Sequence, residues 1–152
     1  MRRMASAVRD CLARSVLAVR VANSIVANVP PRDVGAQIQA IGAWLNAHFR
    51  YLSDPVGVEL LRDPNGGITE ILRYGYTQGD CDEAAMLSAT LGMANGIPAR
   101  FRALAFYSPT APFSHVICDL LGPGNTWIPI DITKPANMDV PPTPTRTLVQ
   151  GV

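Results

Sequence analysis

Three residues of the sequence could together supply a nucleophile, a general base and an orienting carboxylate. Cys81 lies in the run Gly79–Glu83, at the predicted start of a helix, and His115 and Asp131 follow it on predicted strands. A thiol becomes a strong nucleophile only when it is ionised, and the N-terminus of a helix favours the thiolate. A histidine can transfer the proton to a leaving amine, and a carboxylate holds its ring in one tautomer. The three residues therefore predict nucleophilic cysteine chemistry.

The positions of His115 and Asp131 predict that their side chains meet. The segments 115–121 and 126–132 are typical of strands, and the residues Gly122–Asn125 between them are typical of a turn. In such a hairpin, His115 and Asp131 lie at similar distances from the turn and come out roughly opposite each other. We expect the imidazole and the carboxylate to be in contact.

Each of these residues also has a structural interpretation. A cysteine at a helix start is often a small buried hydrophobic residue, and single histidines are mostly structural. Asp80 is interpreted as a helix N-cap, and Asp82 and Glu83 as acids that the helix dipole favours in the first turn. These acids oppose thiolate formation. The presence of all three parts, in order and on suitable elements, favours the catalytic interpretation.

The remaining histidine and cysteines are predicted to be structural. His48 is interpreted as a partly buried helix residue, and Cys11 and Cys118 as core residues. Three cysteines without paired spacing indicate neither a disulfide framework nor a metal site, and they favour a reducing compartment.

Four helices and three strands are predicted around the candidate site, which indicates an α+β fold with helices packed on a small antiparallel sheet. Apolar residues recur at three- and four-residue steps from Val8 to Val26 and from Val34 to Phe49. The predicted helices are one long helix ending before Pro30, one from about Arg32 to the 51–55 turn region, a short one at 68–74 and one from Asp80 or Cys81 to Gly96. The predicted strands are 99–107, 115–121 and 126–132. The loop-rich segment 55–78 and the tail from Pro135 onward are otherwise predicted to lack regular elements.

Length and composition predict one globular domain with short flanking segments. The chain has 152 residues, of which 48% are hydrophobic and 16% charged. We divide it into an N-terminal amphipathic helix at 1–30, which is a candidate docking arm, a central domain at 31–134 and a proline-rich tail at 135–152.

Charge and hydropathy exclude several partners. Residues 1–28 contain five arginines and one aspartate, whereas the whole chain has a net charge of +1. No arginine-rich patch with interleaved aromatic residues follows this segment, so nucleic acid is not an expected partner. No apolar run is long enough to span a membrane, and no cofactor is expected. We expect a protein that is cytoplasmic when made.

Several motifs resemble the transglutaminase-like branch of the papain-like cysteine hydrolase superfamily. They are Gly79–Glu83, Gly96–Arg100, His115 and Trp127–Asp131. Upstream, Phe49, Arg50, Tyr51, Asp54, Pro55 and Glu59 resemble the lead-in of the short transglutaminase-like proteins of bacteriophages and prophages. The resemblance covers roughly residues 34–133. It implies a papain-like core with Cys81 as nucleophile, His115 as base and Asp131 as orienter.

Two functions are expected, the first from this resemblance and the second from the basic first helix and the proline-rich tail that flank it. The first is hydrolysis of an amide, peptide or isopeptide bond in a peptide or protein substrate, because transfer to an amine needs a water-excluding tunnel that the sequence does not indicate. The backbone N–H of Cys81 is then the first oxyanion donor, and the amide of Gln78 is a second candidate, with an ordinary loop glutamine as an equal alternative. The second function is a non-catalytic structural or assembly role in a virion, in which the basic first helix and the tail bind phage structural proteins.

Overall fold

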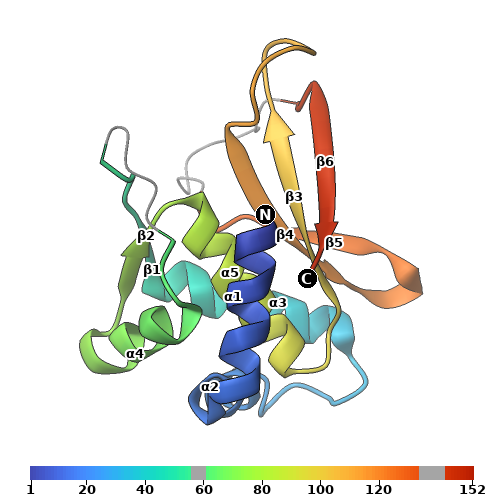
Figure 1. Ribbon diagram of the computed structural model, residues 1–152. Coiled ribbons are helices and arrows are strands. Elements are labelled where there is room, and N and C mark those ends of the chain that lie inside the picture. Colours follow the sequence, from blue (N-terminus) through green and yellow to red (C-terminus); the bar gives the residue numbers. More distant parts are fainter. Residues whose placement is uncertain (56–60, 134–142) are drawn as a thin grey trace.

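The computed structural model describes residues 1–55, 61–133 and 143–152 and combines helices with two β-sheets (Figure 1). The α-helices are α1 (Arg2–Arg14), α2 (Val16–Ile25), α3 (Val34–His48), α4 (Pro64–Tyr74) and α5 (Cys81–Ala94). The larger sheet is antiparallel, in the order β5-β4-β3-β6, and its strands are β3 (Ala99–Ala105), β4 (His115–Leu121), β5 (Trp127–Ile130) and β6 (Arg146–Gly151). A second sheet pairs β1 (Phe49–Tyr51) and β2 (Thr77–Gly79) in parallel. The predicted α+β class is confirmed.

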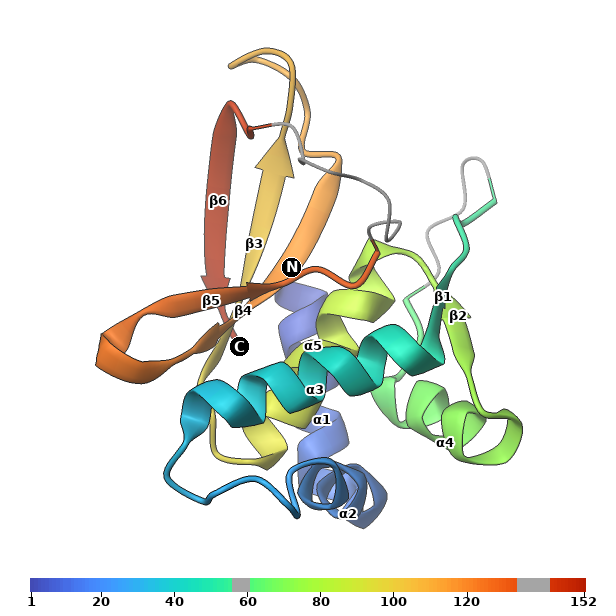
Figure 2. The same cartoon turned by 180° about the vertical axis from the view of Figure 1, so that it is seen from behind.

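Helix α5 lies at the centre of the fold, with the other helices around it and the large sheet on one side (Figures 1 and 2). Every residue from Glu83 to Gly92 is buried. A helix that is apolar on all sides is stable only when neighbours cover it completely, and here α1, α2, α3, α4 and β4 do so. The first residue of this central helix is Cys81, so the most buried element of the fold positions the candidate nucleophile.

The prediction of one long N-terminal helix is wrong, because the chain forms α1 and α2 with a break at Ser15. The backbone of Ser15 is extended, and its hydroxyl accepts a hydrogen bond from the N–H of Ala18 at 3.1 Å. A serine in this position caps a new helix. The apolar repeat continues through the break because both helices bury one face in the same core. The apolar face of α1 is thus covered while its arginines are exposed, and docking through this segment stays a prediction.

The segment before α5 contains more regular structure than predicted. Helix α4 begins at Pro64 rather than at residue 68, because Asp63 caps the helix by accepting from the N–H of Asn65 at 3.0 Å. Proline is well tolerated in the first turn of a helix, because the N–H groups of that turn have no hydrogen-bond partner within the helix. Strands β1 and β2 were not predicted, since three residues are too few for an alternating pattern.

The prediction that the tail lacks regular structure is wrong for its last part. Strand β6 pairs with β3, and Leu148 lies opposite Ala103. It is an edge strand that is mostly exposed, so its sequence carries no alternating apolar pattern. The beginning of the tail and Glu59 of the predicted lead-in lie outside the described residues. The three predicted strands are confirmed as β3, β4 and β5.

Within the described part of the chain, none of the helices combines the length and apolar character needed to cross a bilayer.

Candidate active site

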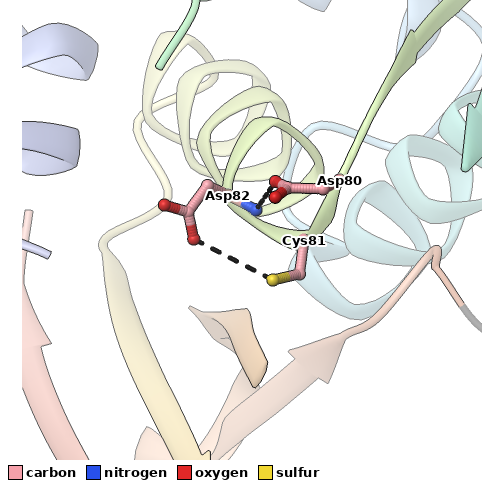
Figure 3. Close-up of side chains that lie close together, drawn as sticks. All are labelled: Asp80, Cys81 and Asp82. Carbon is pink, nitrogen blue, oxygen red and sulfur yellow. Dashed lines mark hydrogen bonds between the residues drawn. The ribbon is translucent and has the colours of Figure 1, made fainter. Parts of the chain in front are cut away.

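The turn from β2 into α5 holds Cys81 in place. Asp80 Oδ1 accepts from the backbone N–H of Asp82 at 2.8 Å, and Glu83 Oε2 accepts from the backbone N–H of Asp80 at 3.1 Å. This reciprocal arrangement is a capping box, which satisfies N–H groups that a helix start leaves without partners. Figure 3 shows the first of these bonds beside the Cys81 sulfur. The predicted N-cap role of Asp80 is confirmed.

Glu83 is more than a first-turn acid, because its side chain is buried between β2 and the segment before α4. Its Oε1 also accepts from the backbone N–H of Arg62 at 3.1 Å. Burial raises the pKa of this carboxyl, and the hydrogen bonds from Arg62 and Asp80 act in the opposite direction. A Cβ atom on Gly79 would lie 2.7 Å from the Cβ of Glu83. The close packing of Gly79 and Glu83 therefore fixes the angle at which α5 leaves β2.

His115 and Asp131 are in contact, as predicted. The distance between His115 Nε2 and Asp131 Oδ2 is 3.0 Å. His115 begins β4, and Asp131 follows the last residue of β5, so the antiparallel pairing of the two strands brings them together. Asp131 Oδ1 accepts from the hydroxyl of Thr133 at 2.7 Å and from its backbone N–H at 3.2 Å. The carboxylate is thus held from both sides.

These contacts determine the protonation of the pair. Burial alone would raise the pKa of Asp131, but hydrogen bonds from His115 and Thr133 outweigh it and lower this pKa to about 2. An ionised carboxylate only accepts hydrogen bonds, so the proton between the two side chains is on Nε2 of His115. In the neutral imidazole, Nδ1 is then the atom with the free lone pair. This nitrogen is available to take a proton.

Cys81 and His115 line the same cavity, which has a volume of about 500 Å³. The backbone of Val116, the residue after His115, forms a hydrogen bond with the Cys81 sulfur. The structure therefore brings Cys81 and His115 to one cavity, and it connects Asp131 to them through the His115 ring.

The resting thiol is directed toward Asp82. Its sulfur donates a weak hydrogen bond to Asp82 Oδ1 at 3.9 Å (Figure 3). Burial raises the pKa of the Cys81 thiol to about 12, with further increases from the negative charges of Asp80 and Asp82 and a decrease from the Val116 hydrogen bond. The prediction that the helix N-terminus lowers this pKa is wrong for the free protein, because burial and the two carboxylates outweigh the dipole.

Gln78 does not reach this cavity. It is the exposed middle residue of β2, between the buried Thr77 and Gly79. It lines another cavity, of about 430 Å³, together with Leu52 and Arg62. Its role as a second oxyanion donor stays a prediction that its position does not support.

The structural interpretations of the remaining histidine and cysteines are confirmed. The ring of His48 stacks on Trp44 with 4.6 Å between centroids, and its Nδ1 lies 2.7 Å from the carbonyl oxygen of Trp44. Cys11 and Cys118 are buried. Cys81 is thus the cysteine that a reagent can reach most easily.

Among the described residues, one group could offer ligands to a metal ion. Asp80, Cys81 and Asp82 each present a ligand atom, and these atoms lie within 4.8 Å of one another (Figure 3). Asp80 already caps the helix through Oδ1. A bound metal ion would use the Cys81 sulfur as a ligand, so the sulfur could not act as a nucleophile. The group therefore fits a nucleophilic thiol better than a metal-binding site.

Sequence reasoning missed several residues of the site. Thr133 holds Asp131 through a short-range contact, and an aspartate followed two residues later by threonine is a pattern that could have indicated it. Met4 and Leu148 line the cavity of Cys81, although they come from α1 and β6. Nothing in the sequence indicates that these distant segments meet.

Comparison with known proteins gives one family match and two similar structures. The family model of the transglutaminase-like superfamily matches residues 19–132. A candidate cysteine protease from Cytophaga hutchinsonii has a similar structure, with a TM-score of 0.59, 22% sequence identity, and coverage of 76% of this chain and 36% of that one. A candidate protease from Parabacteroides distasonis also has a TM-score of 0.59, with 15% identity and coverage of 82% of this chain and 25% of that one. No curated protein matches the sequence.

The two solved structures show the fold alone at these identities, and this chain spans only 36% and 25% of their lengths. The family match is more informative, because it covers three quarters of the chain and includes α5, β4 and β5. Since the family model matches three quarters of the chain, including the segment that carries Cys81, His115 and Asp131, the chain belongs to the transglutaminase-like superfamily.

Proposed function

We propose that this protein is a cysteine hydrolase that cleaves an amide, peptide or isopeptide bond, with Cys81 as nucleophile, His115 as base and Asp131 as orienter. The observation that carries this proposal is that Cys81 and His115 line one cavity while Asp131 contacts Nε2 of the His115 ring. Membership of the transglutaminase-like superfamily supports the same reaction class.

In the first half-reaction, Nδ1 of His115 accepts the thiol proton and the Cys81 sulfur attacks the carbonyl carbon of the substrate. The new C–S bond places negative charge on the carbonyl oxygen. The backbone N–H of Cys81, at the start of α5, is a donor that can stabilise this charge. The C–N bond then breaks, the amine leaves with the proton from His115, and a thioester remains on Cys81.

In the second half-reaction, water replaces the amine. His115 takes a proton from the water molecule while the water oxygen attacks the thioester carbon. The C–S bond then breaks. The carboxylic acid leaves, and the sulfur regains its proton from His115. Asp131 stays ionised throughout, because its role is to orient the ring and to stabilise the imidazolium form.

Labelling with an electrophile tests this proposal without a known substrate. A peptide that carries a thiol-directed warhead should modify Cys81 in the wild type, and Cys81→Ala should abolish the modification while the protein stays folded. His115→Ala should slow labelling about a hundredfold, since general acid–base assistance is typically of this size or larger. His48→Ala is the matched control, because its ring stacks on Trp44 outside the cavity, and it should leave the rate unchanged.

Equal labelling of wild type and Cys81→Ala would refute the catalytic role. So would equal rates for His115→Ala and His48→Ala. A folded protein with an inert Cys81 would favour the alternative prediction of a structural or assembly role in a virion.

A further inference from the structure

The cavity of Cys81 has walls that come from outside the segment matched by the family. The match spans residues 19–132, whereas Met4 lies in α1 and Leu148 in β6. Both residues line the cavity with Cys81 and His115. The two flanking segments are therefore part of the site in this chain.

Two apolar residues of this cavity, one of them from β6, are accessible. Leu148 is 51% exposed and Phe113 is 39% exposed, and both line the cavity. Leu148 projects on the face of the sheet that carries Ala103, its partner on β3 and another lining residue. Strand β6 also supports Phe113, because the Arg146 guanidinium lies 4.5 Å from its ring centroid. Exposed apolar side chains beside a reactive group are typical of a binding subsite.

We propose that Leu148 and Phe113 form a subsite for an apolar side chain next to the bond that is cleaved. This inference rests on the proposed hydrolase function and adds the substrate class to it. The occupant is a residue of the substrate because Leu148 and Phe113 line the same cavity as Cys81. A volume of about 500 Å³ suits one or two residues, whereas a stable protein interface needs a much larger surface.

The chain offers a matched control on the same strand. Val149 is 45% exposed, similar to Leu148, but it pairs with Arg102 and projects to the opposite face of the sheet. A serine at either position changes the same edge strand in a similar way. Only the change at Leu148 alters the cavity.

The experiment compares two peptide electrophiles that differ only in the residue beside the warhead, leucine in one and glycine in the other. We measure second-order rates of Cys81 modification by mass spectrometry. The wild type should react with the leucine probe about tenfold faster, which is the scale of discrimination in apolar pockets. Leu148→Ser should reduce this ratio to about twofold, and Val149→Ser should leave it unchanged.

Equal rates for the two probes in the wild type would overturn the inference, and so would the same ratio in Leu148→Ser and Val149→Ser. Both results would leave the hydrolase proposal standing, because Cys81 would still react with the probes. Failure of the hydrolase proposal has a different signature, namely equal labelling of wild type and Cys81→Ala by both probes, and the subsite would then lose its role as well.

Discussion

Replacing Asp82 with asparagine should make Cys81 more reactive toward a small neutral electrophile. The Cys81 sulfur donates to Asp82 Oδ1 at 3.9 Å, so a thiolate would form beside a negative charge. The pKa of this thiol is about 12, mainly because of burial, and the charges of Asp80 and Asp82 add to the increase. Asp80 is unsuitable for the test because it caps α5. Asparagine at position 82 removes one charge and keeps the size of the side chain.

The size of the effect follows from the distance. Two unit charges about 4 Å apart repel by about 4 kcal/mol at an effective dielectric constant near 20. Water reaches part of the Asp82 side chain and screens this repulsion. With about a third of the energy remaining, removal of the charge lowers the thiol pKa by about one unit. The thiolate fraction then rises about tenfold. A less basic thiolate is also a weaker nucleophile, which cancels about half of the gain on a logarithmic scale, so the rate should rise about threefold.

The assay is the rate of carbamidomethylation by iodoacetamide at pH 8, followed by mass spectrometry of the Cys81 peptide. Cys81→Ala gives the background from the two buried cysteines. Asp10→Asn is the control for a general change in net charge, since Asp10 is exposed on α1 and does not line the cavity of Cys81. A rate for Asp82→Asn that is unchanged or lower would refute the conclusion that this carboxylate suppresses thiolate formation.

Two further predictions concern stability. The pKa of Asp131 is lowered from 3.8 to about 2, because hydrogen bonds from His115 and Thr133 outweigh burial. The ionised form therefore stabilises the fold above pH 4 by about 2 kcal/mol, and this contribution is lost as the pH falls toward 2. Denaturant unfolding at pH 5 and pH 2 should show a smaller loss for Asp131→Asn than for the wild type, and equal losses would contradict the assignment. Gly79→Ala should destabilise the protein by about 2 kcal/mol, since its Cβ would lie 2.7 Å from Glu83 Cβ. Gly66→Ala, which has open space in α4, should instead be neutral or stabilising by up to about 1 kcal/mol, and thermal unfolding that ranks the two variants the other way would show that Gly79 is not closely packed.

Much of the core and the contact between His115 and Asp131 could be predicted from the sequence. Helices α3 and α5 are long enough for their apolar residues to repeat over several turns. The turn residues Gly122–Asn125 specify a hairpin, and a hairpin fixes which residues of β4 and β5 lie near each other. A local rule therefore placed two distant side chains correctly.

The elements that were missed depend on tertiary pairing. Strands β1 and β2 have three residues each and exist because they pair with each other. Strand β6 is an exposed edge, whose pairing with β3 satisfies its backbone although few of its side chains are buried. The break at Ser15 depends on one hydroxyl that caps α2, and an apolar repeat that continues on both sides conceals it. Short and exposed elements carry too little pattern to be recognised before their partners are known.

The pKa of Cys81 shows how burial can reverse a local electrostatic expectation. The start of α5 favours a negative charge, but the same tight turn buries the sulfur and brings Asp80 and Asp82 beside it. The resting site therefore holds a neutral thiol, and proton removal has to accompany attack on the substrate. In the proposed reaction, Nδ1 of His115 takes this proton at the moment of attack. The ionised Asp131, in contact with Nε2, stabilises the imidazolium that forms. In the proposed reaction the carboxylate behind the histidine thus offsets the two carboxylates beside the thiol, and nucleophilicity arises from the pair of Cys81 and His115 rather than from the helix terminus.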